Sequence, residues 1–162
     1  MVGAWPEPVE RVSSFLRESG AEARIQEFPE GTPTAQAAAE AAGCELAQIV
    51  KSLVFMCDER PVVALVPGDR RCDPGKVAAA VEASSARVAK PPEVEEATGF
   101  GPGGVAPFPL PKVESVLMER SFFEHTVVWA GAGSSQHMVG ITPTELGRLS
   151  RARPMDVVAA ET

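Results

Sequence analysis

The stretch that most constrains this fold is residues 48–56, Gln-Ile-Val-Lys-Ser-Leu-Val-Phe-Met. It combines β-branched and apolar residues without Gly or Pro, which predicts a strand. Because side chains alternate along a strand, Lys51 must share a face with Ile49, Leu53 and Phe55. Both faces are mostly apolar, so the Lys51 ammonium must reach water along its stem or bind an anionic or carbonyl partner. A lysine at a strand end or on an edge strand satisfies the first option, and both options stay open.

Length and composition predict an ordinary globular chain. Its 162 residues suit one domain, and 44% hydrophobic with 23% charged residues argues against extensive disorder. A net charge of −7 disfavours a protein that grips DNA or RNA through a broad basic face. A local basic patch of Arg70, Arg71 and Lys76 is left open, with scattered solvated charges as the alternative.

The cysteines predict a reducing compartment. Cys44, Cys57 and Cys72 are odd in number and lack a Cys-x-x-Cys spacing. This favours reduced thiols in a cytoplasmic protein and provides no zinc signature. The first eight residues do not have the pattern of a signal peptide, and no segment is apolar and long enough to span a bilayer, so we expect no membrane association.

Hydrophobic spacing, Thr and Asp caps, and Gly and Pro punctuation predict the remaining elements. Residues 48–56 and 61–66 should form an antiparallel hairpin. The predicted helices are residues 8–19, 74–84, 91–98 and 143–150, together with one that starts at Thr32 or Thr34 and runs to residue 42, and short helical turns lie at 45–48 and 119–123. The other predicted strands are residues 23–28, 86–89, 113–118, 126–130, 137–141 and 155–158.

Residues 99–111 have the most unusual composition in the chain. Four glycines and four prolines lie within these thirteen residues, which excludes ordinary helix or central strand. Glycines let a backbone approach a ligand closely, and exposed amide N–H groups can hold an anion, a carbonyl oxygen or a water. The spacing matches neither a phosphate-binding P-loop nor a dinucleotide fingerprint. The alternatives are a ligand-binding loop and a rigid connector.

A second glycine-containing segment follows the strand at 126–130. Residues 131–136 are predicted to form a polar turn, with His137 opening the next strand. His137 would lie near the first glycine loop if the sheet closes. The alternative for this residue is a structural or surface histidine.

Three segments together carry a resemblance to a known family: residues 38–55, 98–107 and 129–146. They resemble the helix and Lys-bearing strand, the Gly-x-x-x-Pro loop, and the closing hairpin and helix of the YbaK and prolyl-tRNA synthetase editing-domain superfamily. The resemblance covers about residues 9–158. It implies one editing domain over residues 1–162, an α/β fold with a mixed, mostly antiparallel, curved and barrel-like sheet surrounded by helices.

The resemblance also implies a function, hydrolysis of the ester that joins a wrong amino acid to the 3′ end of a tRNA. Lys51 is expected to contact the terminal nucleotide or the aminoacyl group. The backbone of Gly103, Gly104, Val105, Ala106 and Pro107 is expected to hold the carbonyl or the attacking water. The residues expected to bind substrate are Thr98, Gly99, Phe100, Gly133 and His137. The expected partners are aminoacyl-tRNA and a synthetase, with no cofactor or metal.

The sequence has neither a serine nucleophile elbow nor a Cys–His pairing, and hydrolysis of an aminoacyl ester requires neither. An aminoacyl ester is already activated, so positioning, backbone donors and a cation can suffice. Ala106, Phe108-Pro109 and His137-Met138 depart from common family patterns and bear on amino-acid specificity. The expected substrate is a small amino acid, such as Ala, Cys or Ser, on tRNA-Pro or a related tRNA. The alternatives are a non-catalytic module that binds tRNA ends or an aminoacyl group, and a regulatory nucleotide-binding protein.

Overall fold

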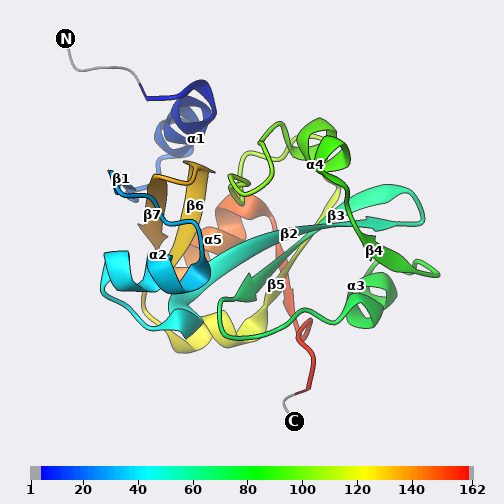
Figure 1. The fold of residues 1–162 in the computed structure, drawn as a ribbon. Coiled ribbons are helices and arrows are strands. Elements are labelled where there is room, and N and C mark those ends of the chain that lie inside the picture. The colour runs from blue at the N-terminus through cyan, green and yellow to red at the C-terminus, as the bar shows by residue number, and fades with distance from the viewer. Residues whose placement is uncertain (1–4, 161–162) are drawn as a thin grey trace.

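The computed structural model describes residues 5–160, and within them helices surround an eight-stranded sheet (Figure 1). The helices are α1 (Glu7–Glu18), α2 (Ala35–Ala42), α3 (Pro74–Ala80), α4 (Pro91–Thr98) and α5 (Pro143–Ser150), with 3-10 turns η1 (Leu46–Gln48) and η2 (Arg120–Glu124). The strands are β1 (Ile25–Glu27), β2 (Ile49–Cys57), β3 (Arg60–Pro67), β4 (Ala86–Val88), β5 (Ser115–Glu119), β6 (Val128–Ser134), β7 (His137–Ile141) and β8 (Arg153–Met155). None of the helices described is long and apolar enough to cross a membrane.

The sheet has the order β1-β7-β6-β2-β3-β5-β8, and β4 pairs with β2 beside this path. The predicted β2–β3 hairpin is confirmed, with Lys51 opposite Val66. The first residues of β2 also pair in parallel with β6, where Ile49 lies opposite Trp129. Lys51 therefore lies on an interior strand, one residue beyond this parallel pairing. Parallel and antiparallel pairs occur in one curled sheet, which confirms the predicted fold class.

The two faces of β2 contribute to different cores, as alternation requires. Val50 and Val54 pack in the largest core, together with α1, α5 and the Gly/Pro-rich loop after α4. Leu53 and Phe55 contact a second core that contains α3 and the C-terminal Val157 and Val158. Lys51 is thus on the α3 side of the sheet, on the face that the sequence predicts.

Helix α3 is shorter than predicted, because it ends at Ala80 and not near Ser84. The Asp58 carboxylate, in the turn between β2 and β3, accepts hydrogen bonds from the Ser84 amide at 2.9 Å and the Ser84 hydroxyl at 2.7 Å. A backbone amide held this way does not continue a helix. The contact spans 26 positions in sequence, so local spacing does not reveal it.

The prediction of a polar turn at residues 131–136 is wrong, because β6 continues to Ser134 and only Ser135 and Gln136 separate it from β7. Gly133 adopts a φ of +102°. A Cβ atom there would lie 2.8 Å from the carbonyl carbon of Pro8. This glycine therefore permits close packing of α1 on a strand and does not mark a turn.

The last predicted strand is also displaced. Strand β8 covers Arg153–Met155 in place of residues 155–158. Beyond it, Val158 forms an isolated bridge with Cys72. The Asp156 carboxylate accepts a hydrogen bond from the Val158 amide at 3.3 Å, a local side-chain contact that competes with continued strand pairing.

Candidate functional site

A cavity of about 170 Å³ lies where the start of β2 meets the N-terminus of α2, the β6–β7 hairpin and the Gly/Pro-rich loop. Lys51, Gly103 and Val105 all line it. Lys51 belongs to the predicted strand, and Gly103 and Val105 belong to the glycine loop about fifty positions later in the sequence. The structure therefore brings the two principal predicted features to one cavity.

Lys51 is half-buried, and its Nζ donates a hydrogen bond to the Arg70 carbonyl oxygen at 2.9 Å. Burial lowers the pKa of this ammonium from its usual value, while the negative charge of Asp69 opposes the shift. An ammonium has three donors, so a bond to one carbonyl leaves capacity for a substrate. Lys51 thus lines the cavity while a backbone carbonyl holds its ammonium.

The Gly/Pro-rich loop is anchored by its buried part and presents its backbone to the cavity. Ala106 and Phe108 are fully buried in the largest core. Gly103 adopts a φ of +82°, and the Gly104 amide donates to the Gly101 carbonyl at 3.0 Å. A Cβ at Gly104 would lie 3.1 Å from the Gly133 carbonyl oxygen, which makes this an unusually close approach of two backbones. Pro107 is buried between the two anchors.

Thr98, Gly99 and Phe100 are not at this cavity. The Thr98 hydroxyl donates to the Val94 carbonyl and accepts from the Phe100 amide, so it terminates α4. Arg11 of α1 donates to the Gly99 carbonyl and lies 4.4 Å from the centre of the buried Phe100 ring. These contacts give the three residues a role in joining α1, α4 and the loop. Thr98 and Gly99 instead border a separate, wider groove beside α4.

His137 also points away from the cavity, whereas its neighbour Met138 lines it. The His137 side chain is 1% exposed, and its Nδ1 lies 2.6 Å from the Ser134 hydroxyl. Its Nε2 lies 3.8 Å from a carboxylate oxygen of Glu27, and its ring packs edge-on against Trp5. His137 therefore reaches the cavity only through Ser134, which lines it.

The sequence reading missed several cavity residues. Ile49, Trp129 and Met138 provide apolar wall, and Ser52 has a buried hydroxyl with no hydrogen-bond partner among the residues described. Alternation along β7 could have identified Met138, because neighbours on a strand face opposite ways. Thr34, which caps α2 through the Ala37 amide, could not have been placed there from local sequence.

Lys51 is the one titratable side chain that lines the cavity in the described part of the chain. Across residues 5–160, no cluster of three or more His, Cys, Asp or Glu side chains is arranged to hold a metal ion. The cavity thus offers one ammonium, several hydroxyls and exposed loop backbone. Such a set can bind an oxygen-rich group and polarise a carbonyl.

Comparison with known proteins connects this geometry to a family. The model of the aminoacyl-tRNA editing domain matches residues 29–149. The uncharacterized protein YwhH of Bacillus subtilis is 34% identical over 127 residues, which cover 78% of this chain and 80% of YwhH. The proline–tRNA ligase of Streptococcus gordonii is 31% identical over 111 residues, 68% of this chain but 18% of the ligase. A crystal structure of a candidate trans-editing enzyme for prolyl-tRNA synthetase superposes with a TM-score of 0.90 at 34% identity, covering 97% of this chain and 100% of that one.

Proposed function

This chain belongs to the aminoacyl-tRNA editing domain family, and from that premise we propose that it hydrolyses the ester of mischarged aminoacyl-tRNA in trans. The observation that best supports the proposal is the shared cavity of Lys51 and the Gly103–Val105 backbone. The editing domain would extend over residues 1–162, with its core at about residues 9–158. A cytoplasmic location and a synthetase partner are further predictions.

The proposed mechanism depends on position and electrostatics. An aminoacyl ester needs no enzyme nucleophile if a water is held beside its carbonyl. Backbone N–H groups of Gly103 and Val105, in the loop that ends at Pro107, would hold the carbonyl oxygen or that water. The Lys51 ammonium would stabilise the negative charge that develops on the oxygen in the transition state. Lys51 then acts as an electrostatic anchor and not as a nucleophile.

Cavity size and lining support a small amino acid as the group that is removed. A volume of about 170 Å³ is below the range of about 300–1,000 Å³ typical of pockets that enclose whole small molecules. An aminoacyl group can enter while the tRNA stays outside. The apolar walls from Ile49, Trp129 and Met138 suit a small side chain such as that of Ala, Cys or Ser. The similarity to proline–tRNA ligases supports tRNA-Pro as the carrier.

The test compares Lys51→Met with the wild-type protein in deacylation of Ala-, Cys- and Ser-tRNA-Pro. Methionine keeps most of the stem and removes the charge, so kcat/KM should fall by about 100-fold or more. The matched control is Lys112→Met, because Lys112 is exposed and borders the separate groove. Unchanged activity in Lys51→Met would remove Lys51 from the mechanism.

The second candidate is a non-catalytic module that binds the tRNA end or an aminoacyl or nucleotide group. One observation favours this second candidate: among the described cavity residues, Lys51 is the one titratable side chain, so no neighbouring acid or base could assist it in catalysis. Binding of tRNA with no turnover of any ester would establish this alternative and refute the hydrolase.

A further inference from the structure

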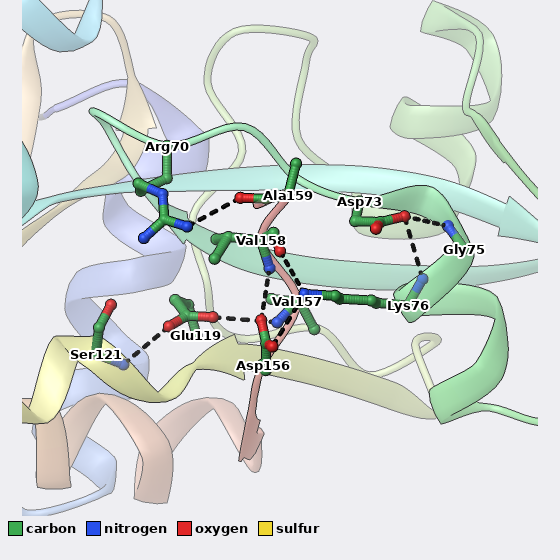
Figure 2. Close-up of polar contacts among 10 residues, drawn as sticks. All are labelled: Arg70, Asp73, Gly75, Lys76, Glu119, Ser121, Asp156, Val157, Val158 and Ala159. Atoms are coloured by element: carbon green, nitrogen blue, oxygen red, sulfur yellow. Dashed lines mark hydrogen bonds and ion pairs between the residues drawn. The ribbon is translucent and has the colours of Figure 1, made fainter. Parts of the chain in front are cut away.

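The loop that holds the Lys51 ammonium is itself held by the C-terminal segment of the chain. Residues 156–159 cross over the loop between β3 and α3, next to α3 and β5 (Figure 2). The Val157 carbonyl accepts from the Asp73 amide at 2.8 Å, and the Ala159 amide donates to the Arg71 carbonyl at 2.7 Å. We call residues 156–159 the C-terminal clamp.

Arg70 connects the clamp to Lys51. Its Nη2 donates to the Ala159 carbonyl at 2.9 Å, while its own carbonyl accepts the hydrogen bond from Lys51 Nζ. One residue therefore meets the clamp with its side chain and the lysine with its backbone. A displacement of Ala159 would move the acceptor that fixes the direction of the lysine head.

The clamp is anchored independently of the loop. Lys76 of α3 donates to an Asp156 carboxylate oxygen at 2.9 Å and to the Val158 carbonyl at 2.7 Å. The buried Glu119 carboxylate at the end of β5 accepts from the Val157 amide at 3.1 Å. Val157 and Val158 are themselves buried in the second core. The clamp is therefore held by polar contacts from α3 and β5 and by the burial of its two valines.

We propose that the C-terminal clamp is a positioning element for Lys51, with Arg70 and Asp156 as positioning residues that fix the lysine head at the cavity. The consequence for activity rests on the proposed function, in which Lys51 stabilises the transition state. A lysine side chain has four rotatable bonds, so one fixed acceptor selects a small part of its conformational space. Preorganisation of this kind raises kcat more than it changes substrate affinity.

The competing explanation is that Arg70 binds tRNA phosphate, as expected for a basic patch. The two explanations predict different kinetic effects when the Asp156 side chain is removed. Removing its carboxylate loosens the clamp, so kcat should fall. Removing the same negative charge should improve phosphate binding, so KM should fall with kcat unchanged.

The kinetic experiment measures kcat and KM for deacylation by Arg70→Ala, Arg70→Lys and Asp156→Ala. We expect kcat to fall by about threefold to tenfold in Arg70→Ala, with little change in KM, partial recovery in Arg70→Lys, and a smaller fall in Asp156→Ala. The matched control is Arg153→Ala, because Arg153 also donates to a backbone carbonyl, that of Ala80 at 2.8 Å, but outside the Lys51 loop. A higher KM in Arg70→Ala with a lower KM in Asp156→Ala would overturn the proposal.

A second measurement needs no substrate. NMR of the lysine ammonium groups should show a Lys51 Nζ signal with slow proton exchange, identified by its loss in Lys51→Met. This signal should broaden or disappear in Arg70→Ala and weaken in Asp156→Ala, but persist in Arg153→Ala. An unchanged signal in both clamp variants would refute the proposal even if activity falls. Normal activity of Lys51→Met with a perturbed signal would instead refute the catalytic role of Lys51 and leave the clamp standing.

Discussion

Replacement of Gly133 by alanine tests whether this glycine serves packing or substrate binding. Its φ of +102° disfavours any residue with a Cβ, at a cost of about 1–2 kcal/mol. The added Cβ would also lie 2.8 Å from the Pro8 carbonyl carbon and 3.0 Å from the Val9 amide nitrogen. These are backbone atoms at the start of α1, so a rotamer change cannot relieve the contact, and overpacking adds about 1–3 kcal/mol.

The two terms add to about 2–5 kcal/mol, less the roughly 0.4–1 kcal/mol gained because alanine restricts the unfolded chain. For a chain of this length each kcal/mol lowers the melting temperature by about 2–4 °C. The net cost is therefore about 1–5 kcal/mol, and we expect Gly133→Ala to melt at least about 2 °C below the wild type.

Urea denaturation and thermal melting measure this difference. The control is Gly101→Ala, because a Cβ at Gly101 would meet no atom within 4 Å and its φ is not positive. If Gly133 instead serves the substrate, Gly133→Ala would lose activity at an unchanged melting temperature. That result would refute the packing argument.

Three further predictions concern the loop, a cysteine and an acid-sensitive ion pair. The substitutions Gly103→Val and Gly104→Val should each lower the rate of deacylation by about tenfold or more, because the added side chain keeps the substrate from the loop backbone. Normal hydrolysis by either variant would show that the loop is only a connector. Burial and the charge of Asp73 raise the Cys72 pKa to about 11, so about 0.1% of this thiol is thiolate at pH 8. Mass spectrometry should therefore show that iodoacetamide labels Cys72 much more slowly than it labels free cysteine. Hydrogen bonds from Arg87 lower the Glu93 pKa from 4.5 to about 2. The stability that this ion pair contributes is present above pH 4.5 and is lost as the pH falls toward 2. The melting temperature of Glu93→Gln should therefore depend less on pH in this window than that of the wild type. Parallel curves of melting temperature against pH for the two proteins would contradict the assignment.

Local signals predicted most elements because their causes are local. Thr34, Asp73 and Thr142 each cap the helix that follows, as their types and the prolines nearby suggest. The alternating faces of β2 follow from the pleat alone. The errors involve distant contacts. Ser84, expected at the end of α3, is held by Asp58 of the β2–β3 turn, and Gly133, expected in a turn, lies in β6 where α1 packs closely on it.

The residues expected at the candidate site also fall into those that the structure places at the cavity and those that it places elsewhere. The family resemblance pointed to Lys51 and to Gly103–Pro107, and the cavity contains the lysine and two loop residues. The same resemblance pointed to Thr98–Phe100, but Gly99 and Phe100 instead contact Arg11, and Thr98 is bonded to the last turn of α4. Arg11 lies 88 positions from Gly99, so no local pattern could assign that contact.

A backbone carbonyl holds the head of Lys51, and the position of this residue in the sheet explains why. Strand β2 pairs with β3 from Val50 onward but with β6 only at Ile49 and Val50, so Lys51 is the first residue beyond the β6 pairing. Its partly desolvated ammonium requires an acceptor. The Arg70 carbonyl supplies one acceptor at 2.9 Å, and a bound ester could supply another. Because this cation and the loop backbone provide most of the polar chemistry at the cavity, activity should be most sensitive to changes at the loop glycines and at the segments that hold Arg70.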